Sequence, residues 1–258
     1  PTRDKNLTRE YEINYLKEHG YEADFTKLEY SINKGLWGTS IGGKETLKSN
    51  ETLPEEAYPT QMTATEESRI TLDFEQGEIA AINGLKFDDK VAAIQYLEEV
   101  VEPYALGRDM HIGDTIIGIK GRVGFEAGAP MLIIAAHKML EKHTLTKWQQ
   151  YWKDQIGTWY GMFLHEAQYL EPVMRDMEAF LESSQDNVTG RVIVDLKPYH
   201  YVLVGVESPF DLMKSDFGEY GELSKGWTAD DVKGFTRILG NQMKIFHNIQ
   251  KRNGKTDE

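Results

Sequence analysis

The chain has 258 residues, of which 40% are hydrophobic, so it can bury a core in one large domain or two small ones. Its net charge of −13, from 42 acidic and 29 basic residues, repels a phosphate backbone and argues against nucleic acid as a partner. Cysteine is absent, which fits a reducing cytoplasm and excludes disulfides and thiolate metal sites; the longest apolar run, Met131 to Ala136, is far shorter than the roughly 20 residues of a membrane span.

Hydrophobic periodicity predicts two helices and a hairpin in the first hundred residues. Thr8 is suited to cap a helix that ends at His19-Gly20. After a stretch of strands and loops, apolar residues alternate on either side of Gln76-Gly77, which is typical of a β-hairpin. Asp88-Asp89 then marks the start of a helix that runs to about Val101.

The rest of the chain alternates between strands and helices without a regular repeat. The apolar run Thr115–Ile119 is predicted to be a strand that ends in a turn at Lys120–Glu126, and Pro130 is placed to open a helix. A second hairpin is expected to turn near Lys197-Pro198. Further helices are expected from about Leu145, over about 172–183 and from Thr228. Mixed hairpins and helices of this kind indicate the α+β class.

Three local patterns resemble catalytic or cofactor motifs but lack their context. Gly38–Gly42 spells the G-x-S-x-G of a hydrolase, yet no helix pattern follows it. The same region almost spells a phosphate loop, but Glu45 stands where a magnesium-binding hydroxyl belongs. His165-Glu166 lacks the second histidine of a zinc protease, so no metal site is predicted. The aromatic cluster from Trp148 to Tyr160 has helical spacing and indicates core or subunit interface.

The stretch TIIGIKGRVGFEAGAP, residues 115–130, holds two cations, a carboxylate and two glycines next to an apolar run. One interpretation is a strand that ends in a solvated turn. The other is a pocket for an anion or an amino acid, because glycine lets the backbone approach a ligand while Lys and Arg donate to carboxylate or phosphate. This segment alone leaves both interpretations open.

Four segments resemble the synthetase domain of argininosuccinate synthase: EYSINKGLWGTSIGGKETL, IIGIKGRVGFEAGAP, HTLTKWQQYWKDQIGTWYG and WTADDVKGFTRILGNQMKIF. They follow in order over nearly the whole chain. The resemblance implies that residues 1–24 are the tail of a nucleotide-binding domain and residues 25–258 a synthetase and multimerisation domain. It also implies a cytoplasmic homotetramer with an extended C-terminal oligomerisation helix.

The resemblance further implies a reaction, the ligation of citrulline and aspartate in arginine biosynthesis. In the family, citrulline attacks ATP to form a citrullyl-adenylate and pyrophosphate, and aspartate then displaces AMP. ATP with Mg binds an S-G-G-x-D-T-S loop in the N-terminal domain, which also holds the aspartate-binding residues. That loop does not occur in these residues, and the chain begins at Pro1. We therefore expect a C-terminal portion that is inactive alone.

Citrulline-binding residues carry over from the family only in part. Two serines nine residues apart match Ser31 and Ser40. The family's K-S-R-G-x-Y-E segment matches here at Lys120, Arg122 and Glu126. Its citrulline-binding Tyr and the Glu twelve residues before it are replaced by Phe125 and Gly113. The catalytic residues themselves are not identified.

The two replacements leave several interpretations open. Without the Glu, a substrate ammonium lacks its partner, unless Asp114 or another group replaces it. The protein has drifted to inactivity, or it acts on an N-acylated citrulline whose α-nitrogen carries no charge. A succinyl group would need a cation, for which His111, Lys120 and Arg122 are the nearest candidates. A non-catalytic oligomerisation module is the alternative from another class.

Overall fold

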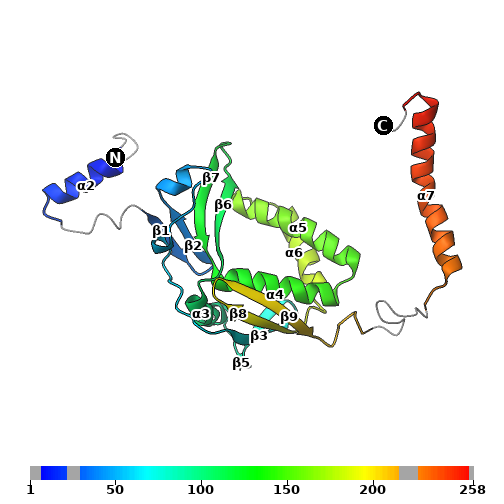
Figure 1. Cartoon of the computed structure of the whole chain (residues 1–258), viewed down its shortest axis with the longest axis horizontal. Coiled ribbons are helices and arrows are strands. Elements are labelled where there is room, and N and C mark those ends of the chain that lie inside the picture. Colours follow the sequence, from blue (N-terminus) through cyan, green and yellow to red (C-terminus); the bar gives the residue numbers. More distant parts are fainter. Residues whose placement is uncertain (1–6, 22–29, 215–225, 256–258) are drawn as a thin grey trace. The chain divides into compact units, whose positions relative to one another are not determined.

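The computed structural model describes residues 7–21, 30–214 and 226–255. Two antiparallel sheets and several helices make up this part of the chain, which confirms the predicted α+β class (Figure 1). The chain divides into two compact units between Phe210 and Asp211. The predicted domain boundary between residues 24 and 25 lies outside the described residues.

Helix α2 (Arg9–Glu18) forms where the sequence predicts it. The Thr8 side chain accepts a hydrogen bond from the Tyr11 amide at 3.3 Å and so satisfies one of the amides left free at the helix start. Gly20 follows the helix with a φ of 77°, a left-handed conformation that glycine adopts without strain.

The five-stranded sheet has the order β5-β4-β3-β8-β9, with all neighbouring strands antiparallel. Both predicted hairpins belong to this sheet and are confirmed. In the first hairpin, Gln76 and Gly77 have φ angles of 48° and 83°, as a type I′ turn requires. The strands are β3 (Ser68–Glu75), β4 (Glu78–Ile82), β5 (Leu85–Lys86), β8 (Gly190–Lys197) and β9 (His200–Glu207).

Two helices, α3 (Lys90–Val101) and α4 (Gly128–Thr144), pack on one face of this sheet and enclose the main hydrophobic core. The α4 contribution comes from side chains four residues apart, which share one helical face. Each fully buried aliphatic side chain stabilises the fold by about 1.5–3 kcal/mol. The fully buried side chains on the two helices are Ala93, Leu97, Val101, Ala129, Leu132, Ala136 and Leu140.

The four-stranded sheet has the order β1-β2-β7-β6 and is also antiparallel throughout. Its β6–β7 hairpin extends away from the core in Figure 1. The strands are β1 (Ser31–Gly35), β2 (Gly38–Gly42), β6 (Arg108–Asp114) and β7 (Lys120–Glu126).

The prediction of a strand at Thr115–Ile119 followed by a turn at Lys120–Glu126 is wrong, because the structure has the reverse. Residues 115–119 form the turn between β6 and β7. The Thr115 hydroxyl donates to the Ile119 carbonyl at 2.6 Å, and Gly118 has a φ of 81°. Residues 120–126 form the strand because β2 and β6 supply hydrogen-bonding partners on both sides.

The predicted aromatic helix is α5 (Lys147–His165), which packs against α6 (Val173–Ser184). Thr146 and Gln149 form a capping box at its start. None of its residues is buried within this unit. Its three tryptophans, Trp148, Trp152 and Trp159, are each more than half exposed. The interpretation of this cluster as core is therefore wrong, whereas the interface interpretation stays a prediction.

Helix α7 (Ala229–Arg252) forms the second unit and begins where Thr228 predicts it. Thr228 and Asp231 form a capping box, and the side-chain hydrogen bond from Thr228 lowers the pKa of the Asp231 carboxyl. No residue of α7 is buried. Neither this helix nor any other in the described part of the chain is long and apolar enough to span a membrane.

A partly buried polar network joins α4, α5 and the residue that follows α6. The Glu141 carboxylate, 5% exposed, accepts from Lys153 at 2.6 Å and from the Gln185 amide at 3.1 Å. His137 lies 2.9 Å from the Gln185 oxygen and 3.7 Å from Glu141. Burial lowers the pKa of His137 below its usual 6.5, and the Glu141 charge opposes this shift only in part.

This lowered pKa predicts a loss of stability on acidification. Below about pH 6.5 the unfolded His137 binds a proton that the folded side chain takes up only at lower pH, so the free energy of unfolding falls as pH falls. His137→Gln removes this group, and urea denaturation between pH 5 and 8 should show a weaker pH dependence for the variant, by at most about 1.4 kcal/mol per pH unit. Parallel curves for the two proteins would contradict this assignment.

Candidate functional site

The register of the four-stranded sheet places Ser31, Ser40, Gly113 and Phe125 on one face. Residues opposite each other in antiparallel strands point to the same side, and alternate residues along one strand do so too. Ser40 lies opposite Phe125, and Ser31 lies opposite a residue two positions from Ser40. The partner of Gly113 on β7 is four residues from Phe125. The sheet thus brings together four residues that are far apart in the sequence.

Lys120, Arg122 and Glu126 alternate with Phe125 along β7 and therefore belong to the opposite face. Lys120 is exposed and forms an ion pair with Asp114, its cross-strand neighbour. His111 lies on the face of Phe125 instead, because it is opposite Val123. Of the pocket candidates, only His111 thus shares a face with Gly113 and Phe125.

The Arg122 guanidinium ties the loop after β2 to β7. It donates to the carbonyl oxygens of Glu45 at 3.0 Å and Glu51 at 2.6 Å, and also to the carbonyl of Lys48. This loop contains the short helix η2 (Lys44–Leu47). Ser40 lies within strand β2 rather than at a strand–helix turn, so the G-x-S-x-G pattern has no nucleophile elbow here.

Arg108 and Glu126 form an ion pair on the same face as Arg122, with side chains only 10% and 5% exposed. The Arg108 Nε donates to Glu126 at 3.0 Å, while its terminal nitrogens donate to Glu55 and to the Thr60 carbonyl. The guanidinium carbon lies 4.4 Å from the centre of the Tyr58 ring. Burial raises the pKa of the Tyr58 hydroxyl, and the Arg108 charge opposes that rise.

A cavity of about 500 Å³ lies between the β6–β7 hairpin and the first turns of α4. His111, Gly113 and Phe125 line it, and the His111 and Phe125 rings meet edge to face at 5.3 Å. Most of its other lining residues are apolar. The side chains that sequence reasoning did not place in this cavity include Trp37, Asp109, Val123, Pro130, Met131 and Ile134.

These lining residues were missed because they lie on four separate segments. The sequence analysis assigned no strand to residues 108–114, so Asp109 could not be paired with Phe125. Exposed and less exposed residues alternate only weakly along β6, because residues 111–114 are all exposed. The start of α4 was predicted, but nothing in its sequence indicates that its first turn meets β7.

Neither serine hydroxyl of this face has a protein hydrogen-bond partner within residues 30–214, and Ser40 is half-buried. A hydroxyl both donates and accepts, so the pair suits a polar ligand such as a ureido or carboxylate group. Among the described residues no group of three or more His, Asp or Glu side chains could hold a metal ion.

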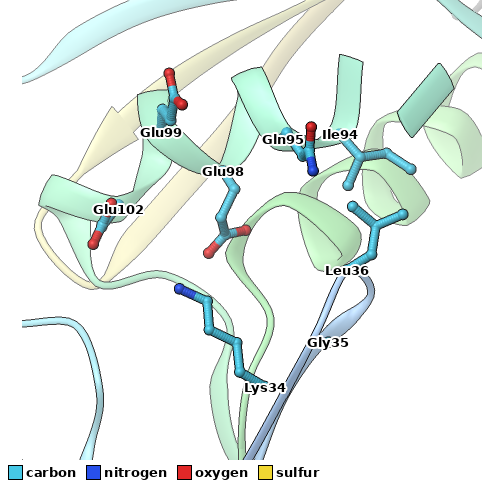
Figure 2. Close-up of a pocket in the computed structure, with 8 residues that line it drawn as sticks. All are labelled: Lys34, Gly35, Leu36, Ile94, Gln95, Glu98, Glu99 and Glu102. Atoms are coloured by element: carbon cyan, nitrogen blue, oxygen red, sulfur yellow. The ribbon is translucent and has the colours of Figure 1, made fainter. Parts of the chain in front are cut away.

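A second cavity, of about 710 Å³, lies between β1 and α3 and is lined by Lys34, Glu98, Glu99 and Glu102, among others (Figure 2). In the figure Lys34 extends toward Glu98. The Glu98 carboxylate accepts from the Ala129 amide at 2.9 Å, and burial raises the pKa of Glu98 above its usual range. Glu98 therefore caps the start of α4 from another helix.

The described residues thus form a domain of the α+β class in which one face of an antiparallel sheet borders a cavity of about 500 Å³. The family model for the arginosuccinate synthase C-terminal domain matches residues 30–246. The chain therefore belongs to this family.

Curated relatives agree with this assignment. The argininosuccinate synthase of Methanocaldococcus jannaschii is 32% identical over 255 residues, which cover 98% of this chain and 64% of the relative. That of Dictyoglomus thermophilum is 32% identical over 248 residues, covering 95% and 62%, and that of Xanthomonas campestris is 30% identical over 257 residues, covering 96% and 63%. The chain thus spans less than two thirds of the length of these relatives.

The burial of Glu126 predicts a structural rather than a ligand-binding role. Glu126→Gln should lower the free energy of unfolding by about 3 kcal/mol, because it leaves a buried Arg108 charge short of its more buried carboxylate partner. The matched control is Asp114→Asn in the same hairpin, whose ion pair with Lys120 is exposed and should contribute less than about 1 kcal/mol. Urea denaturation measures both. Equal, small losses for the two variants would contradict the structural role of Glu126.

Proposed function

We propose that this chain is the citrulline-binding, C-terminal part of an argininosuccinate synthase. ATP with Mg and aspartate bind residues of an N-terminal domain, and the ligation releases AMP and pyrophosphate. The observation that carries the proposal is the convergence of Ser31, Ser40, Gly113 and Phe125 on one sheet face in a chain of this family. Residues 1–24 are then the tail of that N-terminal domain.

In this proposal the two serine hydroxyls hold the polar ends of the substrate. Ser40 lies beside Phe125, so the substrate extends from the serines across β7 toward Gly113. A hydroxyl can donate to a carboxylate or ureido oxygen and accept from a ureido nitrogen. These contacts orient the substrate, while the adenylating groups come from the other domain.

We propose further that the α-nitrogen of the substrate is acylated. A Cβ added to Gly113 meets no atom within 4 Å, so the space that a Glu side chain would fill is open. Asp114 does not replace that carboxylate, because its ion pair with Lys120 is on the opposite face. An amide nitrogen is neutral and needs no carboxylate, whereas a free ammonium next to this open space would lack one.

Asp109 offers an alternative carboxylate that could pair with the free α-ammonium of citrulline. It lies opposite Phe125 and lines the cavity, so its carboxylate is on the substrate's side of the sheet. If free citrulline is the substrate, Asp109→Asn should lower kcat/KM for citrulline about tenfold or more while affecting N-acetylcitrulline little. This variant separates the two kinds of substrate.

The first functional test compares free and acylated citrulline as substrates of the whole protein that the gene encodes. AMP formation with ATP and aspartate should give a higher kcat/KM for N-acetylcitrulline than for citrulline. Gly113→Glu should shift the preference at least tenfold toward citrulline, about 1.4 kcal/mol, because it restores a carboxylate in open space. Gly161→Glu, on exposed α5 with equally open space, is the charge-matched control. A tenfold preference of the wild type for citrulline would rule out the acylated substrate.

A second test concerns assembly, since α7 is proposed to contact another subunit of a homotetramer. Its apolar face is exposed throughout, with Phe235 64% and Leu239 62% exposed. Phe235→Glu combined with Leu239→Glu should lower the molar mass found by light scattering, whereas Asn241→Glu on the polar face should not. An unchanged mass for the double variant would contradict the contact. A protein that assembles but turns over no citrulline would favour the non-catalytic oligomerisation module.

A further inference from the structure

The cavity beside Gly113 has apolar walls. One wall is the face of β6 and β7 that carries Val123 and Phe125, and the other is the first turns of α4. Met131 and Ile134 are 42% and 41% exposed and are turned toward this space. Side chains of this kind gain free energy when a ligand covers them, at a rate that scales with the apolar area removed from water.

No Lys or Arg charge faces this cavity from the residues that line it. Arg108 contributes to the lining, but its guanidinium is bonded to Glu55 and Glu126 on the opposite face of the sheet. Lys120 and Arg122 also belong to that opposite face. The ionisable side chains that remain on the cavity side are Asp109 and His111, and the Asp109 charge repels an anion.

The start of α4 does not offer an anion site either. A helix N-terminus usually binds an anion through its free amides. Here the Glu98 carboxylate already accepts from the Ala129 amide at 2.9 Å, and Pro130 has no amide hydrogen. The Met131 amide donates to the Ala127 carbonyl at 3.1 Å. A ligand carboxylate would therefore find no Lys or Arg charge and no free amide at residues 129–131, and the one basic side chain on its side of the sheet, His111, is accompanied by the Asp109 carboxylate.

From these contacts we infer that the cavity binds an uncharged, apolar acyl group on the α-nitrogen of the amino-acid substrate. This inference rests on the proposed function, because it places the substrate's α-nitrogen beside Gly113. It rules out a succinyl group, whose second carboxylate would be buried beside the Asp109 charge with no Lys or Arg to pair with it. Instead, the acyl chain covers Val123, Phe125 and the side chains of Met131 and Ile134.

The test uses N-butyryl- and N-succinylcitrulline, which differ at the chain end in a methyl group and a carboxylate. Isothermal titration on residues 1–258 and kcat/KM on the protein as its gene encodes it should both favour the butyryl compound at least tenfold. Lengthening acetyl to propionyl and butyryl should raise affinity by about three- to fourfold for each methylene. Equal or better binding of the succinyl compound overturns the inference, and so does failure of every acyl compound to bind.

Placing a cation in the cavity should reverse the preference. Met131→Lys, or Ile134→Lys if the first variant unfolds, should improve binding of the succinyl relative to the butyryl compound at least tenfold. Leu170→Lys, 90% exposed and outside the cavity, is the matched control and should leave the ratio unchanged. A ratio that stays the same in both cavity variants overturns the placement of the acyl group.

The outcomes also separate this inference from the proposed function. Acyl compounds that bind in the predicted order without AMP formation support the cavity assignment and contradict the ligase. AMP formation that prefers free citrulline contradicts acylation and the inference together, and leaves the ligase standing. AMP formation with acetyl and succinyl compounds alike supports acylation and contradicts only the apolar selectivity.

Discussion

The register of β7 between β2 and β6 is the constraint on which the site depends. Side chains alternate between the two faces of a strand, so a slip of one residue would exchange Phe125 for Glu126 on the cavity side. It would also turn the Arg122 guanidinium away from the three carbonyl oxygens that it binds. Burial of Glu126 with Arg108 opposes such a slip, because a displaced pair would leave a charge unpaired.

The two faces of this sheet carry different kinds of side chain. On one face, Arg122 and the Arg108–Glu126 pair anchor the loop after β2 over a small apolar cluster around Ile41. The other face carries the serines and borders the cavity. The polar residues most conspicuous in the sequence thus stabilise the sheet, while a glycine and a phenylalanine line the cavity.

Helix α4 connects the site to the main core. Leu132, Ala136 and Leu140 are fully buried against the five-stranded sheet, while Met131 and Ile134 lie on the cavity side. The position of the cavity wall therefore depends on the packing of the core. Glu98 from α3 adds a second constraint through its hydrogen bond to the start of α4, and this bond also withholds an amide from any ligand.

The sequence by itself determined the local elements, because their signals are local. Thr8, Asp89 and Thr228 mark helix starts by hydrogen bonds within one turn, and Gln76-Gly77 marks a hairpin through its backbone conformation. The family could also be identified from short ordered motifs. Tertiary structure alone decided which side of β7 each residue occupies. The apolar run at 115–119 looked like a strand, but hydrogen-bonding partners exist only for residues 120–126, and those partners are distant in the sequence. The cavity could not be predicted for the same reason. Its walls come from β6, β7 and α4, which are distant in the sequence and meet only after the core has packed.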